Sequence, residues 1–114
     1  MITIYHNPQC RKSRETLKLI EESGEDYEIV EYLKSPPSKD KLRELISKVN
    51  LPFEYFIRKN EAVYKEYFKD KNLSEEQWLD ALVENPKLIE RPIVEKGDEA
   101  VLGRPPENVK QLLD

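Results

Sequence analysis

The chain has 114 residues, the length of one domain, with a formal net charge of −4 at pH 7 and a pI near 5.2. This acidic balance argues against nucleic-acid binding, which usually needs a basic face. No apolar run is long enough to cross a membrane, and residues 1–5 lack the basic start and long apolar stretch of a secretory signal. We therefore expect a cytoplasmic protein without a nucleic-acid or membrane partner.

The first third of the chain predicts a strand, a loop, a helix and a second strand. Residues 2–5 are β-branched and aromatic, as in a short strand, and residues 6–9 contain the Asn-Pro pair that favours a turn. A helical pattern then runs to Ser23-Gly24, a typical helix end, and residues 27–33 alternate as a strand does. A strand, a helix and a strand in this order predict a right-handed unit with parallel strands.

The middle of the chain predicts helices, and its end predicts a hairpin and a last helix. Ser38 is placed to cap a helix, and Ser74 opens a capping-box sequence before another. Residues 91–95 and 100–103 are strand-like and are separated by the turn residues of a hairpin. A last helix follows the prolines at 105 and 106.

The predicted order is β-α-β, a helical insertion over about residues 36–86, and β-β-α. This is the order of the thioredoxin-type fold with an all-helical segment between its halves. We therefore predict an α/β, thioredoxin-like fold in a single domain that spans residues 1–114.

Cys10 is the first candidate for chemistry because it is the only cysteine. One cysteine and one histidine cannot make an internal disulfide or an ordinary four-ligand zinc site, so we expect no metal. A free cysteine is more often a buried structural residue than a reactive one. Cys10, however, directly precedes a predicted helix, whose first N–H groups bind anions and lower the pKa of a thiol. This placement favours a nucleophilic thiolate.

Three cations follow Cys10 in the first helical turn: Arg11, Lys12 and Arg14. Cations at this end oppose the helix dipole, each at a cost of about 0.3–1 kcal/mol, unless an anion or a thiolate offsets them. The alternative is that they are solvated and paired with nearby glutamates. Ser13 stands where a Cys-x-x-Cys redox motif has its second cysteine.

Three further arginines are candidates for binding a tetrahedral oxyanion, because a guanidinium donates paired hydrogen bonds and stays charged. Arg91 precedes Pro92, where thioredoxin-type folds carry a cis-proline beside the cysteine loop. Arg104 follows the hairpin, and Arg58 lies in the helical segment and could cover the pocket. Sequence spacing alone does not bring them together, and a surface ion pair is the alternative for each.

His6 lies four residues before Cys10. It could orient the loop or stabilise the thiolate, although a lone histidine is more often structural.

The chain resembles the glutaredoxin-coupled arsenate reductase family, often called ArsC, over nearly its whole length. The residues that carry the resemblance are Tyr5-His6-Asn7-Pro8-Gln9-Cys10, Ser13-Arg14, Tyr32-Leu33, Pro36-Pro37, Leu42 to Ile46, Arg58-Lys59-Asn60, Asn85-Pro86, Glu90-Arg91-Pro92-Ile93-Val94 and Gly103-Arg104-Pro105. A Cys-x-x-Ser motif alone is weak, whereas this ordered set is specific.

The resemblance implies a thioredoxin-like fold with a helical insertion and an oxidoreductase of the arsenate reductase type. Cys10 matches the family's catalytic cysteine, Arg58, Arg91 and Arg104 match its oxyanion-binding arginines, and His6, Ser13 and Arg14 match its supporting loop. It also implies that the Cys10 thiolate attacks arsenate, that glutathione adds as a thiol co-substrate and that glutaredoxin restores the thiol, with no bound cofactor. The lone cysteine agrees with an external reductant.

The sequence departs from the plasmid-type arsenate reductases at Arg11-Lys12, where those enzymes carry small residues, and it is similar to a short chromosomal branch of the family. Two alternatives stay open. One is a thiol reductase for another oxyanion or a mixed disulfide. The other is an RNA polymerase-binding regulator similar to Spx, although Ser13 counts against the disulfide switch that those regulators commonly carry.

Overall fold

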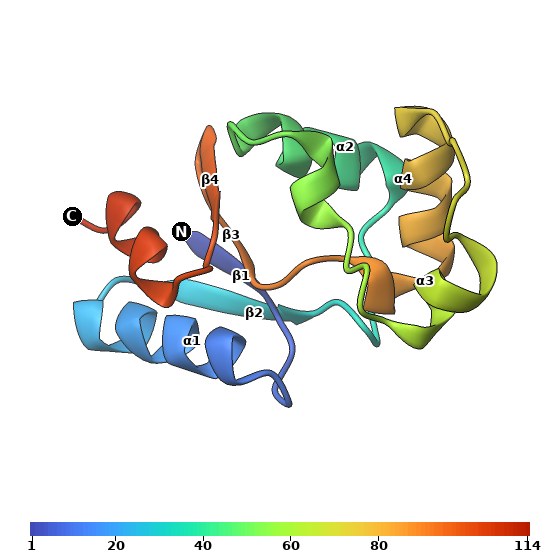
Figure 1. The fold of residues 1–114 in the computed structure, drawn as a ribbon. Helices are drawn as coiled ribbons and strands as arrows, with labels where there is room; N and C mark the ends of the chain where they lie inside the picture. The colour runs from blue at the N-terminus through green and yellow to red at the C-terminus, as the bar shows by residue number, and fades with distance from the viewer.

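A computed structural model describes residues 1–114 and contains one four-stranded sheet in the order β2-β1-β3-β4 (Figure 1). The strands are β1 (Ile2–His6), β2 (Tyr27–Glu31), β3 (Ile93–Lys96) and β4 (Glu99–Leu102). β1 pairs with β2 in parallel and with β3 antiparallel, and β3 and β4 form an antiparallel hairpin. The predicted α/β, thioredoxin-like order is therefore confirmed.

Helix α1 (Arg11–Ser23) and the C-terminal 3-10 helix η3 (Pro106–Gln111) pack together on one side of the sheet (Figure 1). α1 ends at Gly24, whose left-handed backbone (φ 78°) suits a residue without a Cβ. Between these helices and the sheet lies a small apolar core of six buried residues: Ile2, Ile4, Ile20, Val94, Val109 and Leu112.

The helical segment between β2 and β3 lies beyond the other side of the sheet (Figure 1). It contains α2 (Lys39–Lys48), η1 (Phe53–Phe56), α3 (Ala62–Tyr67), α4 (Glu75–Glu84) and η2 (Pro86–Leu88). Ser38 caps α2 by accepting the Lys41 N–H, and Ser74 forms the predicted capping box with Gln77. The apolar faces of these helices join the sheet in the larger core, to which β1 contributes Tyr5. Alternate side chains of β1 thus serve two separate cores.

Several element boundaries, and the type of the last helix, differ from the sequence prediction. β2 ends at Glu31, not at residue 33, because the Glu31 carbonyl accepts the N–H groups of Lys34 and Ser35 in a turn. β3 begins at Ile93, after Pro92, which has no N–H to donate to a neighbouring strand. β4 runs from Glu99 to Leu102, one residue earlier than predicted at each end. The last helix is 3-10 rather than α.

No helix of the chain is both long enough and apolar enough to span a bilayer.

Candidate active site

Cys10 occupies the N-cap position of α1, where β1 passes through a short loop into the helix. The Cys10 N–H donates to the Asn7 carbonyl at 3.0 Å, and the Cys10 carbonyl accepts from the Arg14 N–H at 3.0 Å. The Asn7 side chain accepts from the Gln9 N–H at 3.0 Å. These bonds fix the loop so that the half-buried Cys10 thiol lies at the positive end of the helix.

Ser13 supports this loop from inside. Its side chain is fully buried, its Oγ lies 2.6 Å from His6 Nδ1, and the same oxygen accepts the Asn7 N–H at 3.0 Å. Burial lowers the pKa of His6 and outweighs the nearby carboxylate of Glu31, which raises it, so the neutral imidazole is favoured. Of the two roles open to His6, orienting the loop is therefore the one that the geometry favours.

The three cations after Cys10 have separate environments. Arg11 forms an exposed ion pair with Glu15 at 2.8 Å, and Lys12 is also exposed. For Arg11 this agrees with the alternative that these cations are solvated and paired with nearby glutamates. Arg14 Nη1 donates to the Pro8 carbonyl at 3.0 Å and so braces the loop.

Arg91 and Arg104 are brought to the Cys10 loop by the packing of the hairpin. The Arg91-Pro92 peptide bond is cis, as predicted, and the Arg104-Pro105 bond is cis as well. Arg104 Nη1 lies 4.0 Å from Cys10 Sγ and donates to the Arg91 carbonyl at 3.3 Å. Arg91 is half-buried, whereas Arg104 is exposed.

Gly103 permits this approach. A Cβ at residue 103 would lie 2.6 Å from Thr16 Oγ1 and 2.8 Å from Pro92 Cγ. Only a residue without a side chain therefore lets the end of β4 pass between α1 and the cis-proline. That close passage places Arg104 beside Cys10.

Arg58 reaches the same place from the helical segment. Ile57 and Ile89 form an isolated bridge, and beside it the Arg58 N–H donates to the Leu88 carbonyl at 2.8 Å. Arg58 Nη1 then donates to Glu90 Oε1 at 2.6 Å. The structure thus connects Cys10 with all three predicted arginines, although Arg58 is linked to the sulfur only through Glu90 and Arg104.

Two residues of this cluster were not picked out by sequence reasoning. Glu90 contacts Arg58, and its Oε1 also lies 3.7 Å from Arg104 Nε. Tyr32 is buried, and its hydroxyl has no hydrogen-bond partner. Both residues lie in motifs that carry the family resemblance, Glu90-Arg91-Pro92 and Tyr32-Leu33. The residue type alone, a single carboxylate or tyrosine, does not indicate which side chains it contacts in the fold.

The pKa of Cys10 reflects two opposing effects. Burial alone would raise the pKa, but the backbone N–H of Ser13 and the guanidinium of Arg91 outweigh it, and the pKa is lowered below the ordinary thiol value. Arg91 lowers the pKa of the thiol both by donating to the sulfur and by its positive charge. Thiolate is the nucleophilic form of cysteine, so the arrangement suits attack on an electrophile.

The arginines also have donors to spare. Arg58 Nε and Arg91 Nε are buried and have no hydrogen-bond partner. Since a buried donor without a partner is costly, these groups are suited to an anion that completes the site.

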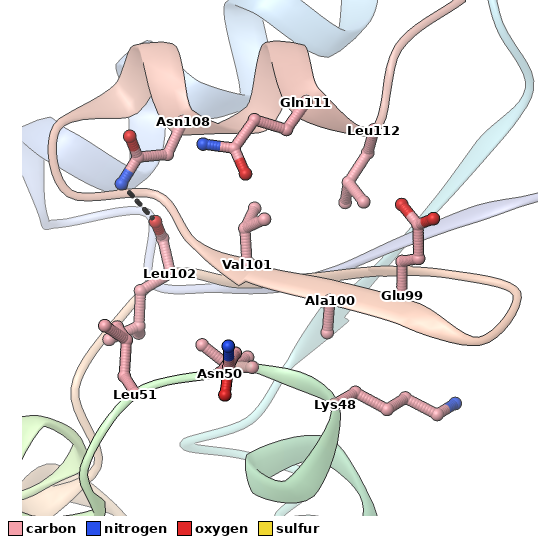
Figure 2. A pocket seen from close by; sticks show the side chains of 11 residues that line it. Lys48, Asn50, Leu51, Glu99, Ala100, Val101, Leu102, Asn108, Gln111 and Leu112 are labelled. Atoms are coloured by element: carbon pink, nitrogen blue, oxygen red, sulfur yellow. Dashed lines mark hydrogen bonds between the residues drawn. The ribbon is translucent and has the colours of Figure 1, made fainter.

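A separate pocket of about 330 Å³ lies at another part of the molecule (Figure 2). It is enclosed by the residues after α2, the strand β4 and the helix η3, with Leu51, Val101 and Gln111 among its lining side chains. None of the predicted site residues lines it.

Comparisons with known proteins agree with the geometry. Residues 5–112 match the ArsC family. The chain is 45% identical over 114 residues to the uncharacterized protein YfgD of Escherichia coli K12, covering 98% of this chain and 96% of that protein. It is 40% identical to a protein named arsenate reductase from Neisseria meningitidis serogroup A, covering 98% and 97%. A solved arsenate reductase from Vibrio cholerae superposes with a TM-score of 0.92 at 43% identity, covering 98% and 97% of the two chains.

Proposed function

The chain belongs to the ArsC family, and from that premise we propose that it is an arsenate reductase in which Cys10 is the nucleophile. The observation that carries the proposal is the contact between the thiol and the arginines: Arg104 Nη1 lies 4.0 Å from Cys10 Sγ. Relatives that share about 40% of its residues are named arsenate reductases, which supports the choice of arsenate over other oxyanions.

The three arginines supply the binding half of the reaction. Arsenate is a tetrahedral anion, and guanidinium groups bind such anions with charge-assisted hydrogen bonds. Arg91 Nε and Arg58 Nε donate no hydrogen bond within the chain, although Glu61 Oε2 lies 3.7 Å from Arg58 Nε, and Arg104 borders the sulfur. An anion held by these groups would place its central atom next to Cys10, which makes attack effectively intramolecular.

The chemistry begins with the Cys10 thiolate. It displaces one arsenate oxygen, which leaves as water after protonation, and a sulfur–arsenic bond forms. A glutathione thiol then adds to the arsenic. As(V) takes up two electrons and leaves as arsenite, while the two sulfurs, one from Cys10 and one from glutathione, are oxidised to a mixed disulfide. Glutaredoxin removes the glutathione by thiol–disulfide exchange and returns Cys10 to the thiol.

The choice of an external reductant is supported by the lone cysteine. Ser13 is buried and hydrogen-bonded at the position where a Cys-x-x-Cys motif has its resolving thiol. A second thiol must therefore come from another molecule, and glutathione is the thiol that the reducing cytoplasm supplies.

Coupled turnover tests this proposal. Arsenate, glutathione, glutaredoxin and glutathione reductase are mixed with the protein, and arsenate-dependent oxidation of NADPH is followed. We expect turnover in the wild type, none in Cys10→Ser, and a loss of at least about tenfold in kcat/KM when Arg58, Arg91 or Arg104 is changed to Ala. Arg43→Ala is the matched control, since this arginine lies in an exposed ion pair on α2.

The absence of arsenate-dependent oxidation, with an active control enzyme in the same assay, would contradict the substrate. If Cys10 still forms a mixed disulfide with glutathione under those conditions, the protein is a thiol reductase for another substrate. Capture of RNA polymerase that survives Cys10→Ser would instead indicate the regulator.

A further inference from the structure

The carboxylate of Glu90 lies inside the cluster of arginines that borders Cys10. Its Oε1 accepts a hydrogen bond from Arg58 Nη1 at 2.6 Å and from the Arg91 backbone N–H at 3.2 Å, and it lies 3.7 Å from Arg104 Nε. The side chain is about one-fifth exposed. An acidic group in this position is unexpected, because it opposes the binding of any anion by the same arginines.

The two oxygens of Glu90 have different environments. Oε1 is held by Arg58 and Arg91 from two sides, whereas Oε2 accepts no hydrogen bond within the chain. The carboxylate is thus anchored through one oxygen and keeps the lone pairs of the other for a ligand. A carboxylate oxygen accepts hydrogen bonds and cannot donate them.

An anion at Cys10 would lie within reach of this oxygen. Arg104 connects the two groups, since its Nη1 lies 4.0 Å from Cys10 Sγ and its Nε lies 3.7 Å from Glu90 Oε1. Arg58 contacts Glu90 as well. A tetrahedral anion that bridges the arginines beside the sulfur therefore also adjoins Glu90.

We propose that Glu90 determines specificity by accepting a hydrogen bond from the hydroxyl group of a protonated oxyanion. This inference rests on the proposed function, because it concerns the same anion site. Arsenate and phosphate keep at least one proton near neutral pH, so each can donate an O–H to Glu90 Oε2. Sulfate keeps none and would place an unprotonated oxygen against the carboxylate.

A site built around a substrate hydroxyl discriminates through the polar group that pairs with that hydroxyl. Such a site rejects an analogue that lacks the hydroxyl, because its own polar group is left unpaired. Here the penalty also includes repulsion between two negative charges. Glu90 thereby converts a general anion site into one that selects hydrogen-bearing oxyanions.

The test measures how arsenate, phosphate and sulfate each protect Cys10 from alkylation by iodoacetamide, an uncharged reagent, at constant pH and ionic strength. In the wild type we expect half-protection by arsenate and phosphate at concentrations at least about tenfold below that of sulfate. In Glu90→Gln the amide can donate to sulfate, so the arsenate-to-sulfate ratio should fall about tenfold. Glu61→Gln is the matched control: Glu61 Oε2 lies 3.7 Å from Arg58 Nε but makes no ion pair with Arg104.

The control variant removes one negative charge near the same arginine, and we expect it to change the three affinities together. A ratio that stays the same in Glu90→Gln, whether the affinities rise or fall, would overturn the inference, and so would an equal change of ratio in Glu61→Gln. If arsenate protects the wild type but the ratio does not respond, only the role of Glu90 fails. If arsenate does not protect the wild type at all, the proposed function fails with it.

Discussion

Arg104 Nη1 lies 4.0 Å from Cys10 Sγ, although 94 positions separate the two residues in the chain. The contact depends on two close approaches that only the fold provides. Gly103 passes between Thr16 of α1 and Pro92, and the loop before α1 holds Cys10 at the positive end of the helix. Charge and sulfur are therefore brought together by the packing of the hairpin against α1.

The first prediction concerns the acidity of Cys10. Because its pKa is lowered, the rate of alkylation should rise with pH and then reach a plateau. The midpoint of this rise should lie below the pKa of free cysteine, about 8.5. Arg91→Gln removes a cation that favours the thiolate, so its midpoint should move to higher pH. Arg11→Gln is the control and should leave the midpoint in place, because Arg11 is exposed and paired with Glu15. A midpoint at or above the free-cysteine value in the wild type would contradict the nucleophile.

The second prediction concerns the buried support of the loop. Ser13→Ala leaves His6 Nδ1 and the Asn7 N–H without their shared partner. We expect the free energy of unfolding to fall by about 1–3 kcal/mol, as for other buried polar groups that lose a hydrogen bond. Urea denaturation measures this loss. Ser47→Ala, at an exposed serine on α2, should change stability by less than about 0.5 kcal/mol, and an equal loss in both variants would argue against a special role for Ser13.

The third prediction concerns the close approach of Gly103 to Thr16, which we expect to position Arg104. Gly103→Ala places a Cβ 2.6 Å from Thr16 Oγ1 and 2.8 Å from Pro92 Cγ, so Thr16, Pro92 or the end of β4 must shift. We expect a loss of about 1–3 kcal/mol in stability together with weaker protection of Cys10 by arsenate, because Arg104 moves with its neighbour. Denaturation and the alkylation assay measure the two effects.

Gly24→Ala provides the comparison for Gly103. Its Cβ would meet nothing within 4 Å, but its φ of 78° is unfavourable for alanine, which costs about 1–2 kcal/mol. This variant should lose stability and keep full protection of Cys10. If Gly103→Ala behaves in the same way, the close approach does not position Arg104.

The fourth prediction concerns a buried ion pair that joins α2 to the sheet. Glu95 is almost fully buried in β3 and accepts hydrogen bonds from Lys48 and from Lys41, the latter at 3.0 Å. Burial alone would raise the pKa of Glu95, but these lysines outweigh it and the pKa is lowered. A carboxyl whose pKa is lower in the folded state stabilises the fold above its unfolded pKa, about 4.3, and that contribution is lost as pH falls through the folded pKa.

Glu95→Gln should therefore lower the stability near pH 7, by less than the roughly 3 kcal/mol of a buried charge left with no partner, because Lys41 and Lys48 still contact Glu44. The difference in stability between wild type and variant should shrink as the pH is lowered below about 4.3. Glu66→Gln, at an exposed residue without an ion pair, is the control and should show no such convergence. A difference that stays constant from pH 7 to pH 3 would show that the charge of Glu95 does not contribute.

Much of the fold could be predicted from the sequence because its signals are local. Ser38 and Ser74 mark helix starts, and the β-branched and aromatic residues at 2–5 mark the first strand, since capping and strand propensity involve neighbours in the chain. The boundaries of the elements depend on contacts that are not local. β2 ends early because Tyr32 turns into the core and the Glu31 carbonyl closes a turn, an outcome that tertiary packing decides.

By itself, the sequence determined that a single thiol precedes a helix and that three arginines stand beside prolines or within the helical segment. It also determined the family, because an ordered set of short motifs is specific even when each motif is weak. Only the tertiary structure decided which groups meet. It placed Arg104 against Cys10, and it linked Arg58 to Arg104 through Glu90, a residue that local patterns do not distinguish from a surface carboxylate. Contacts between residues far apart in the chain depend on the packing of the sheet and the helical segment, and no local propensity encodes them.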